Sequence, residues 1–324
     1  MTQWLNKTVL GFLAGVAVCA LGWWFLSASN SKKVVEERPV VSSFSFSPEI
    51  PSEIVFCGER ISLEPFQVHE NFDRELSSFT YLHSTTMLLL KRANRFFPIV
   101  EPILRENGIP DDFKYLAVIE SNLDVRATSS ARAVGLWQFL ESTGKQYGLT
   151  VTPTVDERRH VEKSTVAACK YLKDAYKKYN DWSLVAASYN GGMGRITDEL
   201  NKQQADSYFD LWLVEETTRY VYRIMAIKQI FENPYKYGFV LKPENLYKPM
   251  QYKEVSVSQD IADLADFAKK QGVSYGDLKR YNVWLRDRKL VTGGKTYKIK
   301  IPNANAVSYH HPNTYVHNPR WVTQ

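Results

Sequence analysis

A change in hydrophobic periodicity near residue 241 constrains the fold more than any other feature of the chain. From residue 66 to about residue 237, apolar side chains recur at helical spacing and no strand-like alternation interrupts them. The predicted helices span roughly 72–95, 97–107, 111–121, 136–146, 158–179, 182–190 and 215–232. Gly108 and the pair Gly191-Gly192 are suited to end helices. Residues 66–240 are therefore expected to form an all-α domain.

The residues that follow have a different pattern. Segments 252–258 and 295–301 alternate as strands, and they enclose helical stretches at 259–271 and 274–281. The chain is therefore predicted to be mainly α, with a small β-α-α-β domain after the helical one. The expected boundaries are a linker at 241–250, the small domain at 251–302 and a polar, mobile tail at 303–324.

The N-terminal part carries an export signal. Residues 9–26 are an almost unbroken apolar run with lysines on both sides, long enough to span a bilayer and also typical of a long signal-peptide core. Ser27-Ala28-Ser29 is an acceptable cleavage site, whereas Trp23 and Trp24 favour a retained anchor. We expect a signal peptide or membrane anchor at 1–30, and a location in the periplasm or cell envelope.

A segment rich in serine, proline and valine follows, and residues 31–65 are predicted to be a linker. The chain has three cysteines, Cys19, Cys57 and Cys169, fewer than an exported protein that relies on disulfides usually has. Cys169 suits a core position, and a Cys57–Cys169 bond stays open.

Several classes of function have no support in the sequence. It contains no GxGxxG, Walker A, HExxH or zinc-type Cys/His spacing, so we expect no cofactor and no metal. The net charge is +6, but the basic residues are scattered along amphipathic helices. Nucleic acid is therefore not an expected partner.

Glu120 lies on a helix face that should be buried. Phe113, Leu116, Ala117 and Glu120 fall at i, i+3, i+4 and i+7 and share one side of the predicted helix 111–121. A carboxyl group in apolar surroundings resists ionisation, which raises its pKa toward the range of a general acid. Spacing alone leaves open the other interpretation, a solvated glutamate at a frayed helix end.

Four clusters occur in order along the helical region. They are Glu120-Ser121 with Ala127-Thr128-Ser129-Ser130, then Gly135-Leu136-Trp137-Gln138-Phe139, then Ala187-Ser188-Tyr189-Asn190-Gly191-Gly192, and finally Glu216-Thr217-Thr218-Arg219-Tyr220-Val221. With these clusters, residues 66–236 resemble the soluble-lytic-transglycosylase domain, a goose-lysozyme-like fold that cleaves bacterial peptidoglycan. The branch that the chain most resembles is the membrane-bound lytic murein transglycosylase D branch, which carries Trp in the second cluster.

The resemblance implies that Glu120 is the single catalytic acid and base. It would protonate the oxygen between N-acetylmuramic acid and N-acetylglucosamine, and then deprotonate the muramoyl C6 hydroxyl. That hydroxyl attacks C1 of the same sugar and gives a 1,6-anhydro product. An internal nucleophile replaces the second carboxylate that hydrolytic glycosidases usually need. Asp124 is the nearest candidate for such a carboxylate, but we interpret it as a turn residue.

The resemblance also implies a set of substrate-binding residues: Ser129, Gln138, Tyr189, Asn190 and Tyr220. Tyr220 is expected to hydrogen-bond Glu120 and orient it. The amides of Gln138 and Asn190 suit N-acetyl and hydroxyl groups, although each can instead be a buried amide that bonds backbone. Trp137 is either a sugar-stacking platform or plain packing.

Two positions depart from the pattern of the family. Ser188 replaces the usual alanine, and Arg132 stands where many relatives have glycine. Both lie beside the motifs, so an active enzyme is still expected.

The second domain resembles a LysM domain, a fold that binds glycans containing N-acetylglucosamine. The matching stretches are 261–273, 278–282 and 293–299. Ser258-Gln259-Asp260 replaces the usual Gly-Asp-Thr, so the fold can be present without glycan affinity. Tyr275, Tyr281 and Trp284 are candidates either for sugar stacking or for the small core.

Three hypotheses follow for the function. The first is a peptidoglycan lytic transglycosylase that acts on glycan strands and meets the membrane through its N-terminal segment if that segment is not cleaved. The second is a goose-type muramidase that uses water. The third is a catalytically silent peptidoglycan-binding scaffold, which an intact Glu120 argues against, because a scaffold gains nothing from a buried acid.

Overall fold

The computed structural model describes residues 46–303 and 314–323. The chain divides into two units at Phe46/Ser47, and everything below concerns the second unit, Ser47–Gln324. The predicted signal or anchor at 1–30 lies outside the described residues. Within those residues, no helix combines the length and apolar character that a bilayer crossing requires.

A short hairpin opens the described chain. Strands β1 (Glu53–Phe56) and β2 (Glu59–Ser62) pair antiparallel, and the turn residues Cys57 and Gly58 have positive φ. Ile54, Phe56 and Ile61 are buried in the core. The prediction of a linker over 31–65 is therefore wrong for this stretch, because alternate apolar residues of two four-residue strands pack inward.

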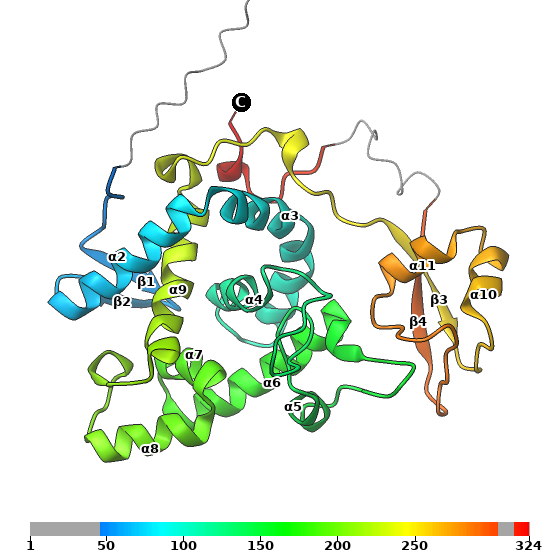
Figure 1. Cartoon of the computed structure of the whole chain (residues 1–324), viewed down its shortest axis with the longest axis horizontal. Coiled ribbons are helices and arrows are strands. Elements are labelled where there is room, and N and C mark those ends of the chain that lie inside the picture. The colour runs from blue at the N-terminus through cyan, green and yellow to red at the C-terminus, as the bar shows by residue number, and fades with distance from the viewer. Residues whose placement is uncertain (1–45, 304–313, 324) are drawn as a thin grey trace, which may run out of the picture. The chain divides into compact units, whose positions relative to one another are not determined.

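The helical region follows. Its helices are α2 (Phe66–Tyr81), α3 (His83–Glu106), α4 (Lys114–Ser121), α5 (Glu141–Gln146), α6 (Val161–Tyr179), α7 (Trp182–Gly191), α8 (Met193–Gln203) and α9 (Glu215–Glu232). A 3-10 turn, η1 (Asp111–Phe113), leads into α4. Helix α9 packs against α2, α4 and α7, which makes it the central helix of the domain (Figure 1).

The boundaries differ from the predicted ones in three places. The break between the first two helices falls at Leu82, and α3 continues through Pro98 and Pro102 because its apolar face is buried against the core. Of the predicted helix 136–146 only α5 is helical. Helix α8 was not predicted, and only Ile196 of its side chains is buried, which explains the weak apolar signal.

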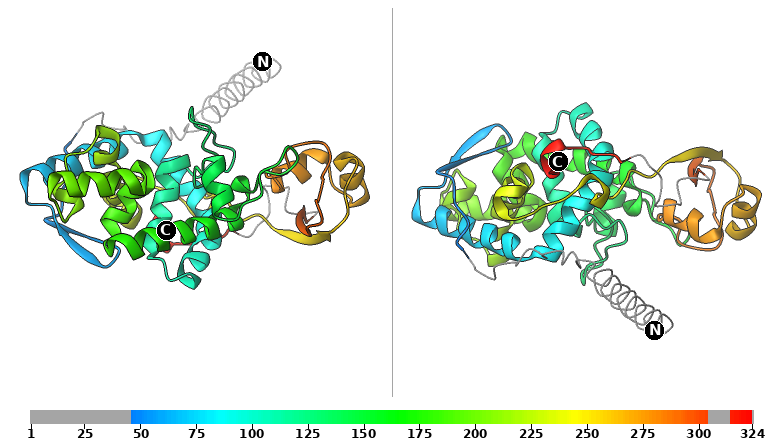
Figure 2. Two further views of the ribbon diagram at one scale, coloured as in Figure 1. Left: turned by 90° about the horizontal axis from the view of Figure 1, so that it is seen from below. Right: turned by 90° about the horizontal axis from the view of Figure 1, so that it is seen from above.

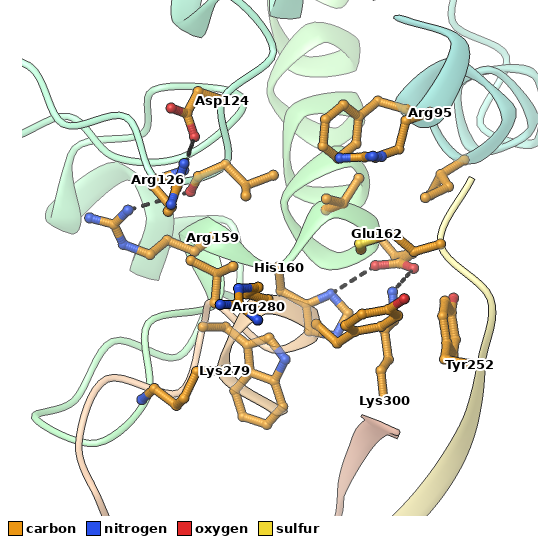
Figure 3. Close-up of a pocket in the computed structure, with 18 of the residues that line it drawn as sticks. Arg95, Asp124, Arg126, Arg159, His160, Glu162, Tyr252, Lys279, Arg280 and Lys300 are labelled. Carbon is orange, nitrogen blue, oxygen red and sulfur yellow. Dashed lines mark hydrogen bonds and ion pairs between the residues drawn. The ribbon is translucent and has the colours of Figure 1, made fainter. Parts of the chain in front are cut away.

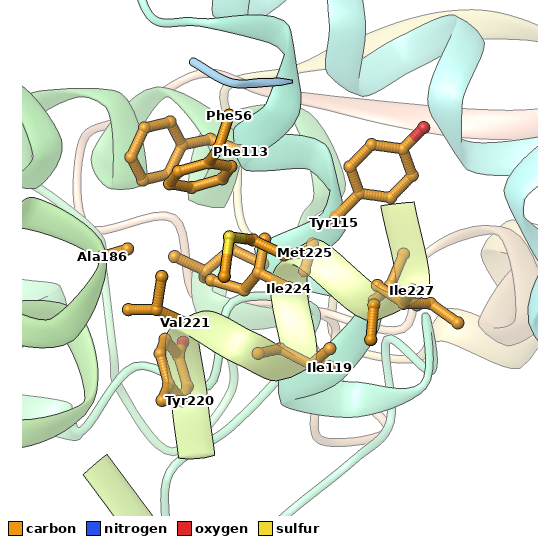
Figure 4. Close-up of a cluster of buried hydrophobic side chains, with 14 of the residues drawn as sticks. Phe56, Phe113, Tyr115, Ile119, Ala186, Tyr220, Val221, Ile224, Met225 and Ile227 are labelled. Atoms are coloured by element: carbon orange, nitrogen blue, oxygen red, sulfur yellow. The ribbon is translucent and has the colours of Figure 1, made fainter. Parts of the chain in front are cut away.

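The core beside α4 is built on α9. In Figure 4, Val221, Ile224 and Met225 of α9 lie among Ile119 of α4 and the ring of Phe113. The sequence pattern predicted one buried face on α4, with Phe113, Leu116 and Ala117. The structure buries those residues and also Tyr115, Val118 and Ile119, so α4 is enclosed on nearly all sides.

The β-α-α-β order of the second domain is confirmed. Its elements are β3 (Tyr252–Val257), α10 (Leu264–Lys270), α11 (Tyr275–Tyr281) and β4 (Tyr297–Pro302). The strands pair antiparallel, from Tyr252 opposite Pro302 to Val257 opposite Tyr297. Trp284 is buried, with its ring stacked 5.4 Å from that of Tyr297, so it belongs to the core.

The C-terminal tail was predicted to be mobile, and for residues 314–323 the structure corrects this. Trp321 is buried, and its Nε1 donates a 2.9 Å hydrogen bond to the carbonyl oxygen of Phe231. The Thr323 amide donates to the Leu241 carbonyl. The chain end lies against the helical region in both views of Figure 2. A buried side chain and backbone hydrogen bonds together hold this segment against the helical region.

Candidate active site

Glu120 lies at the C-terminal end of α4. The helix stops after Ser121, because Asn122 and Leu123 adopt left-handed backbone angles with φ of 52° and 55°. The Ser121 hydroxyl lies 3.1 Å from the Ala117 carbonyl oxygen and 2.9 Å from that of Leu136. The end of the helix is thereby tied to the Gly135–Phe139 motif, and Glu120 itself is half-buried.

Tyr220 on α9 meets this carboxyl group. Its hydroxyl donates a hydrogen bond to Oε1 of Glu120, as the resemblance led us to expect. Arg223 and Glu216 also act on the charge of Glu120. Neither was predicted as a site residue, although Glu216, Tyr220 and Arg223 stand at i, i+4 and i+7 and therefore share one face of α9.

The pKa of Glu120 is raised from 4.5 to about 7, mainly because burial disfavours the carboxylate. The nearby charge of Glu216 raises it further, whereas the Tyr220 hydrogen bond and the charge of Arg223 lower it. At neutral pH the carboxyl group is therefore populated in both protonation states. Of the two sequence-based interpretations, this favours a perturbed acid over a solvated glutamate.

The Gly135–Phe139 motif forms a tight loop beside α4. Gly135 has φ of 84°, and a Cβ there would lie 2.0 Å from the carbonyl oxygen of Arg158. Gln138 is half-buried, and its Nε2 donates a 2.8 Å hydrogen bond to the Gly135 carbonyl. Trp137 is fully buried and donates to Thr165 Oγ1 at 2.9 Å, so it is packing rather than a sugar platform.

Tyr189 and Asn190 extend the site from α7. The Tyr189 hydroxyl donates to the Trp137 carbonyl at 2.7 Å. Burial raises the pKa of Tyr189 well above its ordinary value, and the charge of nearby Glu120 adds to this. Asn190 Oδ1 accepts a 2.9 Å hydrogen bond from Thr217 Oγ1, and its Nδ2 donates to Glu216 Oε1 at 3.3 Å. Both side chains are therefore held in place by neighbouring segments.

Ser129 is placed differently from the other predicted residues. Its exposed hydroxyl accepts a 3.0 Å hydrogen bond from the Ala133 amide and closes a surface turn. Arg132 in this turn has φ of 61°, a conformation that glycine adopts without strain. Among the described residues, no hydrogen bond joins Ser129 to another predicted site residue. Tyr220 bonds Glu120 directly, Tyr189 bonds the loop that carries Gln138, and Asn190 bonds Glu216, whose charge acts on Glu120.

Asp124 caps the turn after α4. Its Oδ1 accepts a 2.9 Å hydrogen bond from the Arg126 amide, as expected for a turn residue. Cys57 and Cys169 are both free thiols. Within residues 46–303 and 314–323, no group of three or more His, Cys, Asp or Glu side chains is arranged to hold a metal ion.

Comparison with protein families gives two matches. Residues 98–211 match the transglycosylase SLT domain. Residues 253–305 match the soluble lytic transglycosylase C-terminal LysM-like domain. The first match lies within the helical region and ends before α9, and the second covers the β-α-α-β domain.

The curated relatives include membrane-bound lytic murein transglycosylase D of Escherichia coli K12, which is 30% identical over 259 residues. This alignment covers 78% of the chain and 56% of the relative, and the protein of strain O6:H1 gives the same values. The chain thus spans about half the length of these relatives. Among solved structures, the lytic transglycosylase Slt of Pseudomonas aeruginosa is 20% identical over 42% of this chain and 23% of that chain, with a TM-score of 0.36.

Proposed function

Because the chain belongs to the SLT-domain lytic transglycosylases with a C-terminal LysM-like domain, we propose that it is a peptidoglycan lytic transglycosylase. It cleaves the β-1,4 bond between N-acetylmuramic acid and N-acetylglucosamine and forms 1,6-anhydro-N-acetylmuramic acid. The observation that carries the proposal is the half-buried carboxyl group of Glu120, with its pKa near 7 and its hydrogen bond from Tyr220.

Glu120 acts first as the acid. Its protonated form donates a proton to the glycosidic oxygen while the C1–O bond of the muramoyl residue breaks. A carboxyl group with a pKa of about 7 still holds that proton in a substantial fraction of the molecules at neutral pH. An ordinary glutamate, with a pKa near 4.3, would already have lost it.

Glu120 then acts as the base. The carboxylate removes the proton of the C6 hydroxyl, and that oxygen bonds to C1 of the same sugar. The hydrogen bond from Tyr220 favours the carboxylate and fixes its orientation for this step. The acid is regenerated, and no water is consumed.

The other site residues bind the glycan in this proposal. Gln138 and Asn190 present amides to N-acetyl and hydroxyl groups, and Ser129 contacts the strand from its exposed turn. Tyr189 supports the loop that carries Gln138 through the Trp137 carbonyl. The LysM-like domain adds glycan contacts, and the protein acts in the periplasm or cell envelope.

A muramidase that uses water is the second candidate, and one observation favours it. Glu216 is a second carboxylate whose charge acts on Glu120. Its Oε1 accepts a hydrogen bond from Asn190, and the side chain is exposed, so it can reach a water molecule. Inverting glycosidases place a second carboxylate in this role.

The nature of the products separates the two candidates. Purified peptidoglycan is digested with the full chain in detergent, and the soluble muropeptides are analysed by mass spectrometry. Products one water lighter than hydrolytic muropeptides, lost in Glu120→Gln and retained in Glu216→Gln, are expected. Reducing ends that disappear in Glu216→Gln would instead establish a muramidase, and binding without any release would establish a scaffold.

A further inference from the structure

A basic groove lies between the helical region and the LysM-like domain. It encloses about 850 Å³ (Figure 3). Its walls are held together by direct contacts: the Asp156 amide donates to the Trp284 carbonyl at 2.9 Å, and the Arg286 amide donates to the Thr154 carbonyl at 2.9 Å. Lys300 of β4 forms an ion pair with Glu162 of α6. These contacts hold the helical region and the LysM-like domain together on the two sides of the groove.

Positive charge dominates this groove. Nine lysines and arginines line it, against three carboxylates. Each carboxylate is already paired within the groove: Asp124 with Arg126, Glu162 with Lys300, and Asp277 with Arg280. The excess of cations is therefore not offset by acidic side chains of the lining. These residues come from distant segments, so their clustering was not visible in the sequence.

Within the described part of the chain, two of the cations donate hydrogen bonds to neutral oxygens and to no carboxylate. Arg159 donates to the Val125 carbonyl at 3.4 Å and to Thr128 Oγ1 at 2.9 Å. Lys279 donates to the carbonyl oxygens of Leu285 and Asp287. Burial, together with the charge of Arg286, lowers the pKa of both groups. Arg286 therefore repels both Arg159 and Lys279, and an anion bound in the groove would reduce this repulsion.

Buried donors without acceptors also line the groove. Trp284 is 3% exposed and Arg159 is 9% exposed. In the described structure, neither Trp284 Nε1 nor Arg159 Nε has a hydrogen-bond partner. A buried donor left unpaired is unfavourable, so a ligand with acceptor oxygens would gain from both. Arg159 is labelled in Figure 3 among the basic side chains of the groove.

We propose that this groove binds the carboxylate groups of the peptides attached to the glycan strand. The proposal rests on the proposed function, since that substrate carries a peptide with free carboxylates on its muramoyl residues. The binding of a neutral sugar does not require such an excess of positive charge. Leu123 and Arg126 line the groove and follow Glu120 by three and six residues, so the groove begins beside the end of the helix that carries Glu120.

Binding of three ligands to the full chain tests this inference. The ligands are soluble glycan strands with intact peptides, the same strands with the peptides removed by an amidase, and peptide-bearing strands whose carboxylates have been converted to amides. The protein carries Glu120→Gln so that the strands stay intact. We expect about tenfold tighter binding of the first ligand than of the other two, the effect of one or two charge-assisted hydrogen bonds.

A pair of variants assigns the effect to the groove. Arg286 lines it and is exposed, whereas Lys289 is an exposed cation of the same loop that does not line it. Arg286→Glu should remove most of the preference for peptide-bearing strands, and Lys289→Glu should keep it, with equal melting temperatures. Equal effects of the two variants, or no preference in the parent protein, would overturn the inference. The inference would also be overturned if Arg286→Glu weakened binding to DNA or to vesicles of anionic lipid and left the binding of peptide-bearing strands unchanged.

The proposed function is measured separately. With Glu120 intact, Lys289→Glu, whose residue does not line the groove, should release the same anhydro products from peptide-free strands as the parent protein does. Absence of anhydro products in both proteins, together with a preserved preference for peptides, would reject the transglycosylase and leave the binding groove standing.

Discussion

The hydroxyl of Tyr220 donates a hydrogen bond to the carboxylate of Glu120 across a sequence separation of 100 residues. The bond joins the central helix α9 to the end of α4, and it opposes the effect of burial on the pKa of Glu120. Without this hydrogen bond the pKa of Glu120 would lie higher than about 7, because the bond stabilises the carboxylate that burial disfavours.

The first prediction concerns pH. If protonated Glu120 starts the reaction, kcat/KM on soluble glycan strands should fall as the pH rises through about 7. The Tyr220 hydrogen bond stabilises the charged form, so Tyr220→Phe should move this falling limb to higher pH. The measurement is the pH profile of both proteins. A limb that stays in place or moves to lower pH would contradict the assignment.

The second prediction concerns stability. The folded protein holds a proton on Glu120 up to about pH 7, whereas the unfolded chain loses it near 4.5. Since the folded state binds more protons in this window, its stability must fall as the pH rises. Between pH 5 and 8 the free energy of unfolding should drop by about 2 kcal/mol more in the parent protein than in Glu120→Gln. Urea unfolding at both pH values measures this, and equal drops would refute it.

The third prediction tests how Asn190 is held. Thr217 is buried, and its hydroxyl donates to Asn190 Oδ1. Thr217→Val keeps the shape of the side chain and removes the hydrogen bond, so we expect KM for glycan strands to rise by about fivefold, as one hydrogen bond is worth about 1 kcal/mol. Thr218→Val, which removes a bond to the Leu213 carbonyl, is the matched control and should leave KM unchanged.

The fourth prediction concerns the loop of Gln138. Gly135→Ala would place a Cβ 2.0 Å from the Arg158 carbonyl oxygen, at a positive φ. We expect a loss of more than about 2 kcal/mol in the free energy of unfolding. Gly194 of α8 has no atom near its ideal Cβ, so Gly194→Ala should instead stabilise the protein by about 0.5–1 kcal/mol. Denaturant unfolding of both variants measures these changes. Similar free energies of unfolding for the two variants would show that the close approach of Gly135 to the Arg158 carbonyl does not restrict residue 135 to glycine.

The fifth prediction tests the docked tail. Trp321 packs its ring against Phe97 and Phe231, so Trp321→Ala should cost about 3–5 kcal/mol. Tyr315 of the same segment is 41% exposed, and Tyr315→Ala should cost less than about 1 kcal/mol. A small effect of Trp321→Ala on thermal unfolding would mean that the tail is not part of the folded core in solution.

Local patterns in the sequence determined the classes of element and their order. The helical spacing predicted α4 and the burial of Phe113, Leu116 and Ala117, because a helix with one apolar stripe must cover it. The alternation at 252–258 and 295–301 predicted the paired strands of the LysM-like domain in the same way. The order of the motifs indicated the family, which the matches to both domain models confirm.

Only the tertiary structure decided what surrounds each of these residues. Trp137 is packed in the core because Thr165 lies next to it, and Trp321 is packed because Phe231 lies next to it. Both partners come from segments far away in the chain. The pKa of Glu120 depends on burial by the folded core and on Tyr220, Arg223 and Glu216 of α9, and the basic groove on arginines and lysines scattered through the sequence. The periodicity of a segment indicates which face of that one helix or strand is buried. The burial of a side chain and the electrostatic potential at it depend on all of its neighbours in space, and these are brought together only when the chain folds.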